Sequence, residues 1–272
     1  MSRNAERTYW ETRLGESYTL EGVGYVGLGR SFNSWMYRVR STLARLRLQS
    51  LLPERRSLSV LDVGSGTGFY IDLWRRLGVR SVTGSDLTET AVHELRRRFP
   101  AEEFIRLDIG ADRLPPEGRR FDVVSAFDVL FHIVDDEAYR RSFQNIAGVL
   151  RPGGTLVFTD NFVHRAAARS STQASRTLTD IEATVRAAGF EVVYRRPAFV
   201  LMNAPVDSGS TLHGRWWGLL TRAVSTSDVI GWLAGALLFP IEVALCSLLR
   251  EGPSTEMMVC RRIESTGGNG VL

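Results

Sequence analysis

Between residues 58 and 160, short apolar runs alternate with segments in which apolar residues recur every three or four positions. The apolar runs are LSVLDVG, SVTGSD, EEFIRLD, FDVVSAF and TLVFTD, and the helical segments between them include TGFYIDLWRRLG and DDEAYRRSFQNIAGVL. Strands that alternate with helices at this spacing predict a parallel sheet with helices on both faces. Two more strands, over residues 190–197 and 254–262, complete a predicted Rossmann-like α/β fold with a seven-stranded, mostly parallel sheet.

Several helix ends carry local signals. Asp135 or Asp136 can cap the start of the helix that runs to residue 150, and the Pro-Gly-Gly turn after it ends that helix. Thr179 and Glu182 have the spacing of a capping box for the next helix. Gly189 is expected to end that helix in a left-handed conformation.

Two segments lie outside the repeat of strands and helices. The N-terminal one contains the glycine-rich run EGVGYVGLG, which favours flexible closure over a site, and a helix that Pro53 ends. The second separates the last two strands. We predict an N-terminal cap or lid at 1–56, a core at 57–201, an apolar helical insertion at 202–253, the closing strand of the core at 254–263 and a flexible tail at 264–272.

The insertion contains VIGWLAGALLFPIEVALCSLL, which is long enough to span a bilayer. Pro240 and Glu242 interrupt its middle, and a charge in hydrocarbon is costly. A single crossing would also separate the closing strand from the sheet it must join. We therefore expect a bent helix or helix pair that roofs the site. Its apolar residues indicate a partly lipophilic substrate, a homodimer interface or a peripheral membrane contact, and the sequence leaves these three open.

Composition excludes few functions. The chain has 272 residues, 44% of them hydrophobic, and a formal net charge of +4, and every cationic side chain is Arg. The Arg pairs are spread along the chain among acidic residues, which is typical of solvated helix faces, so we expect no nucleic-acid partner. Cys246 and Cys260 provide no disulfide framework, and the first residues lack the apolar core of a secretion signal, so we expect a cytoplasmic protein.

The loop after the first strand of the repeat contains three glycines. Gly64, Gly66 and Gly68 form G-x-G-x-G, whereas a dinucleotide fingerprint needs G-x-G-x-x-G, so NAD is disfavoured. Glycines allow a ligand to approach the backbone, and the following helix N-terminus favours an anionic group such as a carboxylate.

Acidic residues end three successive strands. Asp86 lies where a carboxylate can accept hydrogen bonds from both ribose hydroxyls, and Asp62 and Asp108 end the neighbouring strands. Three such carboxylates suit a cationic cofactor with hydroxyls and an amine better than one with a pyrophosphate.

Five motifs in order carry a family resemblance: VLDVGSGTG, the strand end at Asp86, RLDIG, FDVVSAFDVLFHI, and VLRPGG before TLVFTD. Over about residues 58–190 the chain resembles the class I S-adenosylmethionine-dependent methyltransferases of the small-molecule type. The resemblance implies S-adenosylmethionine as cofactor and S-adenosylhomocysteine as product. It implies these cofactor contacts: Asp62, Gly64, Gly66 and Gly68 for the methionine part, Asp86 for the ribose, Leu87 for the adenine face, Asp108 and the Ile109 backbone N–H for the adenine edge, and Phe127.

Candidates for the methyl-accepting side lie after the fourth and fifth strands. His132 is placed as general base or substrate orienter, with ordering of its own loop as the alternative, and Asp160 is a second catalytic candidate. Candidate substrate contacts are Tyr25, Asn161, His164, Trp216 and Trp217.

The segment GTLVFTDNF resembles the metal-binding strand end of the catechol-type O-methyltransferases. The acidic partner residue should then lie at Phe127, but the sequence has Asp128 one position later. We therefore predict no metal site and no role for Mg²⁺.

The predicted function is methylation, most favourably on oxygen, of a small and partly lipophilic metabolite. The segment AFDVLF replaces the N-P-P-Y type of turn expected for methylation of a nucleobase amine. Carbon methylation, a cyclase built on the same fold, and a non-catalytic partner in a natural-product or glycolipid pathway remain open alternatives, because a fold does not fix its chemistry.

Overall fold

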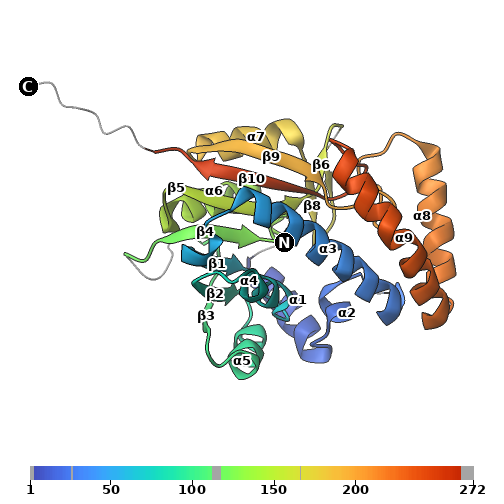
Figure 1. The fold of residues 1–272 in the computed structure, drawn as a ribbon, viewed down its shortest axis with the longest axis horizontal. Coiled ribbons are helices and arrows are strands. Elements are labelled where there is room, and N and C mark those ends of the chain that lie inside the picture. Colours follow the sequence, from blue (N-terminus) through green and yellow to red (C-terminus); the bar gives the residue numbers. More distant parts are fainter. Residues whose placement is uncertain (1–2, 26, 112–117, 166, 265–272) are drawn as a thin grey trace, which may run out of the picture.

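A seven-stranded sheet forms the centre of the computed structural model, which describes residues 3–25, 27–111, 118–165 and 167–264. The strand order is β3-β2-β1-β4-β5-β10-β9 (Figure 1). β10 is antiparallel to β5 and β9, and the remaining pairs are parallel. The strands are β1 Ser59–Val63, β2 Ser81–Asp86, β3 Glu103–Arg106, β4 Phe121–Ala126, β5 Leu150–Asp160, β9 Phe190–Pro197 and β10 Glu256–Arg262. The predicted fold class is confirmed.

Alternate residues of each strand face opposite helical layers. Leu61 and Val63 of β1 pack in one core with α6, Asp136–Val149, and α7, Leu178–Ala187. Val60 packs in a second core with the helices of the other layer. Those helices are α3 Gly29–Leu51, α4 Phe69–Leu77 and α5 Glu89–Arg98. Burial of both faces explains why the central strands are continuous apolar runs.

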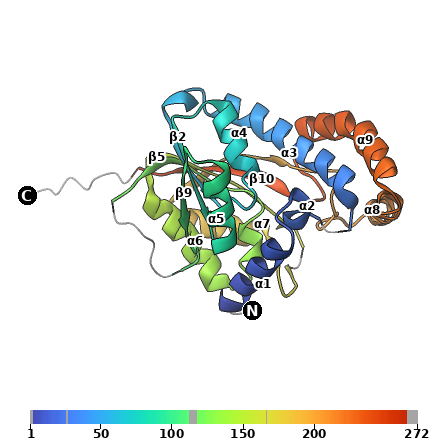
Figure 2. The ribbon, with the colours of Figure 1, turned by 90° about the horizontal axis from the view of Figure 1, so that it is seen from below.

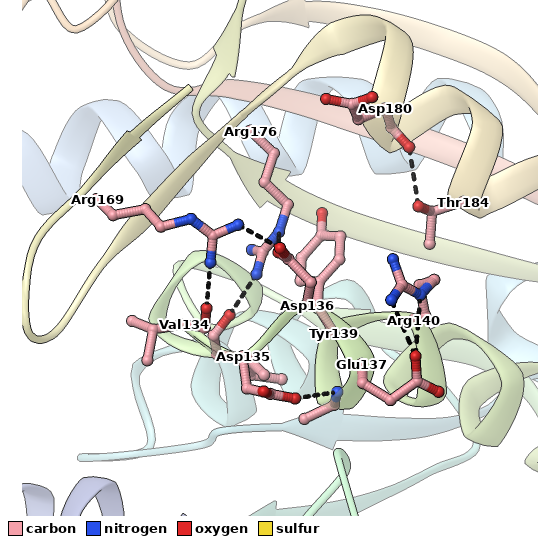
Figure 3. A network of polar contacts seen from close by, with 12 residues as sticks. Val134, Asp135, Asp136, Glu137, Tyr139, Arg140, Arg169, Arg176, Asp180 and Thr184 are labelled. Carbon is pink, nitrogen blue, oxygen red and sulfur yellow. Dashed lines mark hydrogen bonds and ion pairs between the residues drawn. The ribbon is translucent and has the colours of Figure 1, made fainter. Parts of the chain in front are cut away.

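A second, small sheet follows β5. It has the order β6-β8-β7 and was expected from the sequence only as a polar stretch. Figure 3 shows how it joins the start of α6: Arg169 and Arg176 both reach the Asp136 carboxylate, and the Arg176 guanidinium lies 3.7 Å from the ring centre of Tyr139. The strands are β6 Phe162–Val163, β7 Ala168–Arg169 and β8 Ala174–Thr177.

The helix caps agree with the sequence in two cases and differ in one. Asp135 caps α6 by accepting a hydrogen bond from the Ala138 N–H, and Gly189 has a φ of 83° after α7. The expected cap at Thr179 is wrong. Thr177 caps α7 by accepting from the Asp180 N–H, because it offers the same hydroxyl two residues earlier, where β8 ends.

Helices from both ends of the chain surround the sheet's carboxyl edge. The N-terminal part forms α1, Arg3–Glu16, and α2, Leu20–Val23, before α3, and a short 3₁₀ turn, Arg55–Ser57, leads into β1. Between β9 and β10 the chain forms α8, Thr211–Val224, and α9, Asp228–Leu248. Figures 1 and 2 show α8 and α9 together at one end of the molecule, with α3 beside α9. The tail expected at 264–272 lies, after Glu264, outside the described residues.

Small residues allow α9 to pack closely on α3. A Cβ at Gly235 would lie 2.3 Å from a ring atom of Trp35, and one at Gly231 would lie 3.4 Å from Phe32. On the same face of α9, Glu242 is buried and accepts hydrogen bonds from the backbone N–H groups of Val200, Leu201 and Met202. α9 is thereby held along its length to α3 and to the chain that leaves β9.

We expect Gly235→Ala to lower the free energy of unfolding by about 1–3 kcal/mol, because its methyl group must displace the Trp35 indole. Gly218→Ala is the matched control on α8, where nothing lies within 4 Å of the added Cβ. The control should be neutral or stabilising by up to about 1 kcal/mol, since Ala favours a helix over Gly. Urea unfolding compares them, and equal stability of the two variants would contradict the packing of α9 on α3.

Candidate active site

A cavity of about 400 Å³ lies at the carboxyl ends of β1, β2 and β4, beneath α1 and the start of α3. It brings together ten of the residues that the sequence singles out: Tyr25, Gly64, Gly66, Asp86, Leu87, Asp108, Ile109, Phe127, His132 and Asn161. The other six lie away from the described lining: Asp62, Gly68, Asp160, His164, Trp216 and Trp217. Residues expected to bind the cofactor and residues expected to bind the methyl acceptor therefore line the same cavity.

The glycine loop forms the floor of this cavity. Gly64 has a φ of 69°, and a Cβ there would lie 2.3 Å from Val129, so a side chain is excluded. The Gly66 N–H donates to Asp86 Oδ2 at 2.9 Å, and the Gly66 carbonyl accepts from the Tyr18 hydroxyl at 2.8 Å. The backbone of the loop is thus fixed from both sides and open toward the cavity.

Asp86 also organises the end of β2. Its Oδ1 accepts from the N–H and the hydroxyl of Thr88, while its Oδ2 holds Gly66. Burial raises the pKa of this carboxyl, and the bonds from Thr88 and Gly66 oppose that rise. Oδ2, which accepts only the Gly66 N–H, keeps acceptor capacity, and Asp86 lines the cavity.

Asp62 lies behind the glycine loop at the end of β1. Its Oδ1 accepts from the Ser125 hydroxyl at 2.6 Å, and its buried Oδ2 has no hydrogen-bond partner within the described part of the chain. Burial raises the pKa of this carboxyl to about 7. A positive charge held on the nearby loop would favour its ionised form.

The far end of the cavity, at Asp108, is covered by α1. Arg3 Nε donates to Asp108 Oδ2 at 3.1 Å, and Glu6 pairs with the same guanidinium. Trp10 and Arg13 of α1 also line the cavity. Sequence reasoning missed these four residues of α1, because nothing in the pattern of that helix marks a surface that meets a cavity.

Asp128 follows β4 and has a strained backbone conformation. On sequence alone it is considered only as a metal ligand that lies one position after the expected one. Asp128 has a φ of 57°, a conformation that non-glycine residues rarely adopt. Its N–H donates to the Thr159 hydroxyl at 2.7 Å, which in turn donates to Asp128 Oδ1, and Arg40 Nε lies 2.9 Å from Oδ2. Arg40 and Asp128 both line the cavity. Strain held by three contacts is typical of a functional position.

His132 lines the cavity from the short 3₁₀ turn Leu130–His132. Its Nδ1 lies 2.8 Å from the Thr172 carbonyl oxygen. Because a carbonyl can only accept, Nδ1 carries the proton, and the lone pair of the neutral ring is on Nε2. Burial lowers the pKa of His132 to about 4, so the ring is neutral at physiological pH. The edge-on ring of Trp10, at 4.8 Å between centroids, covers it.

Two further acceptor-side candidates, Asp160 and His164, lie away from the cavity lining. Asp160 is fully buried, accepts from the Tyr139 hydroxyl and the Asn161 N–H, and has its pKa raised to about 6 by burial. His164 is exposed and bonded to Asp207 at 2.6 Å. Asn161, by contrast, lines the cavity. Among the described residues, no cluster of three or more His, Cys, Asp or Glu side chains could hold a metal ion.

Comparisons with known proteins identify a domain in the part of the chain that forms most of this cavity. Residues 60–154 match the family model described as a methyltransferase domain. The chain is 35% identical over 139 residues to the tRNA U34 carboxymethyltransferase of Methylococcus capsulatus, covering 48% of this chain and 40% of that protein. It is 35% identical over 112 residues to the malonyl-[acyl-carrier protein] O-methyltransferase of Enterobacter lignolyticus, covering 41% and 42%. The matches span less than half the length of either relative.

A solved structure shows the same fold over nearly the whole chain. It is the 1,6-didemethyltoxoflavin-N1-methyltransferase of Burkholderia thailandensis, with a TM-score of 0.59 at 19% identity, covering 97% of this chain and 92% of that one. The comparisons support the resemblance of the core to the class I S-adenosylmethionine-dependent methyltransferases. The methyltransferase domain contains the glycine loop and the strand ends described above.

S-adenosylmethionine fits the residues that are present. A Cβ at Gly64 would fill the floor on which the methionine part is expected to lie, and Asp86 offers acceptors to the ribose hydroxyls. Asp108 would share its carboxylate between Arg3 and the adenine amine. The unpartnered Oδ2 of Asp62 provides negative charge behind the loop.

We expect Asp62→Asn to change how stability depends on pH. The folded-state pKa of about 7 lies above the ordinary 3.8, so the protonated carboxyl stabilises the fold at low pH, and this contribution is lost as pH rises from about 4 to 7. Between pH 5 and pH 8, the free energy of unfolding of the wild type should therefore fall relative to that of the variant. Urea unfolding at each pH measures this difference. A pH-independent difference would show that Asp62 titrates normally.

We expect Asp86→Ala to weaken S-adenosylmethionine binding at least about 30-fold, or about 2 kcal/mol, because charge-assisted hydrogen bonds to the ribose and the anchor of Gly66 are lost together. Calorimetric titration measures this. Glu191→Ala, at an exposed carboxylate on β9, is the control and should bind normally. Unchanged affinity in Asp86→Ala would overturn its assignment to the ribose.

Proposed function

We propose that the protein transfers a methyl group from S-adenosylmethionine to a hydroxyl oxygen of a small, partly lipophilic metabolite. One observation about His132 carries this proposal. The Thr172 carbonyl holds the ring proton on Nδ1, so the lone pair on Nε2 can accept a hydrogen bond from a ligand in the cavity. The malonyl-[acyl-carrier protein] relative is an O-methyltransferase by name, which agrees with the proposal.

His132 is suited to hold and remove the proton of the accepting hydroxyl. The cofactor, when bound, supplies an activated methyl group on a cationic sulfur, and the transfer is an in-line displacement that needs an aligned acceptor. His132 Nε2 accepts the hydrogen bond of the hydroxyl, which points an oxygen lone pair away from the ring. As the O–C bond formed, the bond from sulfur to the methyl carbon would break and S-adenosylhomocysteine would leave; the oxygen would become strongly acidic, and His132 Nε2 would take its proton. The low pKa of His132 keeps Nε2 free of a proton beforehand.

The cavity walls support a substrate with both apolar and polar parts. Leu14, Tyr37 and Phe131 provide apolar surface, and amide groups face the cavity as well. These amides belong to Asn161, Gln173 and Asn203. Tyr25 lines the cavity and is partly exposed. Trp216 and Trp217 lie on α8 and do not line the cavity. A hydroxylated metabolite with an apolar body matches this lining.

The Arg40–Asp128 pair and α1 prepare the site for this chemistry. The pair presents a carboxylate and a guanidinium at fixed positions beside His132, so it can orient a polar group of the substrate. Trp10 of α1 covers the His132 ring and keeps water from it. Cys246 and Cys260 are free and buried, which suits the reducing cytoplasm in which we place the reaction.

We expect His132→Ala to lower kcat by about 10²-fold or more, the usual contribution of a general base, while the affinity for S-adenosylmethionine stays nearly unchanged. His93→Ala, at an exposed His on α5, is the matched control and should be fully active. Turnover is followed with hydroxylated test substrates as one S-adenosylhomocysteine formed per methylated product. Product formed without S-adenosylhomocysteine would replace the proposal by a cyclase.

The pH dependence tests the same assignment. Because burial lowers the pKa of His132 to about 4, its basic form is complete above about pH 5, and kcat should show no titration of this ring between pH 6 and pH 8. An increase in kcat with pH near pH 6.5 that is absent from His132→Ala would contradict the buried environment described for the ring.

A further inference from the structure

The α8–α9 hairpin leaves a large apolar surface uncovered. α9 turns Gly231, Gly235, Leu238, Glu242 and Cys246 toward the protein. Its opposite side is exposed along the whole helix and carries no charge between Val229 and Leu249. We call this surface the apolar face and define it by Leu212, Trp216 and Leu219 of α8 with Val229, Ile230, Trp232, Leu233, Leu237, Ile241, Leu248 and Leu249 of α9 and its end. Soluble proteins rarely expose so much contiguous apolar surface without a partner.

α9 is long and apolar enough to cross a membrane by length and composition, but its attachments exclude a crossing. β9 and β10, which precede and follow the hairpin, are hydrogen-bonded neighbours in one sheet. Glu242, in the middle of α9, is bonded to three backbone N–H groups of residues 200–202. The helix is therefore held flat against the protein, and its apolar face can only lie along a surface.

The unpaired charges on α3, α8 and α9 are positive. α3 and α8 contain no acidic residue, and the two acidic residues of α9 are engaged: Asp228 accepts from the Ser31 N–H, and Glu242 is bonded as described. On α3 and α8, five exposed arginines form no ion pair with any described residue: Arg30, Arg38, Arg45, Arg215 and Arg222. The surface thus combines uncovered apolar area with uncompensated positive charge.

These arginines adjoin the apolar face. Arg38 lies over the Trp35 ring at 4.3 Å, and Trp35 contacts the exposed Trp232 of α9. Arg45 follows on the same side of α3, two helical turns after Arg38. Arg215 precedes Trp216 directly on α8. The arrangement is an apolar centre with tryptophans and a rim of arginines.

We propose that the apolar face binds the surface of a bilayer that contains anionic lipids. An apolar helical side with Trp and flanking Arg partitions into the headgroup region, and each Arg is attracted to anionic headgroups. A second copy of this chain fits less well, because a symmetric contact through this face would bring two sets of unpaired arginines together. The bilayer supplies the negative charge that the helices lack.

Binding in this orientation brings the cavity close to the lipid. Tyr25 lines the cavity, is partly exposed, and contacts Trp217 of α8 with 5.7 Å between ring centroids. Trp217 is the neighbour in the chain of Trp216, which belongs to the apolar face, so this face lies close to the Tyr25 side of the cavity. A lipophilic metabolite dissolved in the membrane would have a short path to the site.

Flotation of the full-length protein with vesicles tests the proposal. Phosphatidylcholine vesicles with and without about 30% phosphatidylglycerol are compared at low salt, and the ratio of bound to free protein should be at least about tenfold higher on the anionic vesicles and should fall as salt is added. Leu237→Glu replaces a side chain that is 70% exposed and should lower that ratio at least about tenfold.

Ile263→Glu is the matched control. Its side chain is 55% exposed directly after β10, whose C-terminal end lies away from α8 (Figure 1), and vesicle binding should be unchanged. Circular dichroism and thermal unfolding confirm that both variants fold. Absence of wild-type flotation, or equal flotation of Leu237→Glu, overturns the proposal. A wild-type dimer in sedimentation equilibrium that Leu237→Glu dissociates, without vesicle binding by either, assigns the face to a second copy instead.

Discussion

The Asp86 carboxylate joins the ends of two parallel strands, and the geometry of the site depends on that connection. One oxygen holds the Gly66 N–H of the loop after β1, and the other holds Thr88 at the start of α5. The glycine loop can remain open toward the cavity because it is fixed from outside, by Asp86 on one side and Tyr18 on the other. The same carboxylate lines the cavity, so one side chain both shapes the floor and is available to a ligand. Such sharing makes the cofactor side rigid before any ligand binds.

The acceptor side is built differently, from residues far apart in the chain. Arg40 of α3 reaches Asp128 after β4, and Thr159 of β5 holds Asp128 in a left-handed conformation. The tautomer of His132 is set by the Thr172 carbonyl, and Thr172 lies in the loop between β7 and β8 of the small sheet. The cofactor side thus relies on neighbouring strand ends, whereas the acceptor side combines the ends of β4 and β5 with α3 and with the loop between β7 and β8. The relatives that match this chain include an O-methyltransferase and a C-methyltransferase by name.

Sequence patterns were sufficient for the strands of the seven-stranded sheet, the glycine loop and Gly189, because each is fixed by local periodicity or by a positive φ that glycine adopts easily. They placed the cap of α7 at Thr179, since two threonines with the same local chemistry compete and the end of β8 selects Thr177. The contact of Arg3 with Asp108 and that of Arg40 with Asp128 could not be predicted, because long-range pairs have no local signal.

The insertion was correctly placed between the last two strands. The expected role of Trp216 and Trp217 in roofing the site is not supported by the cavity lining, because α8 packs beside α9 at the end of the molecule.

Calorimetric titration of the purified protein with S-adenosylmethionine, with NADH in a parallel experiment, tests the central claim most directly. The account predicts one site per chain with micromolar affinity for S-adenosylmethionine and no binding of NADH, since the loop has the spacing G-x-G-x-G and carboxylates at three strand ends. Failure of S-adenosylmethionine to bind the folded protein would contradict the account. The cavity at Gly64 and Asp86 would then belong to a scaffold without its cofactor.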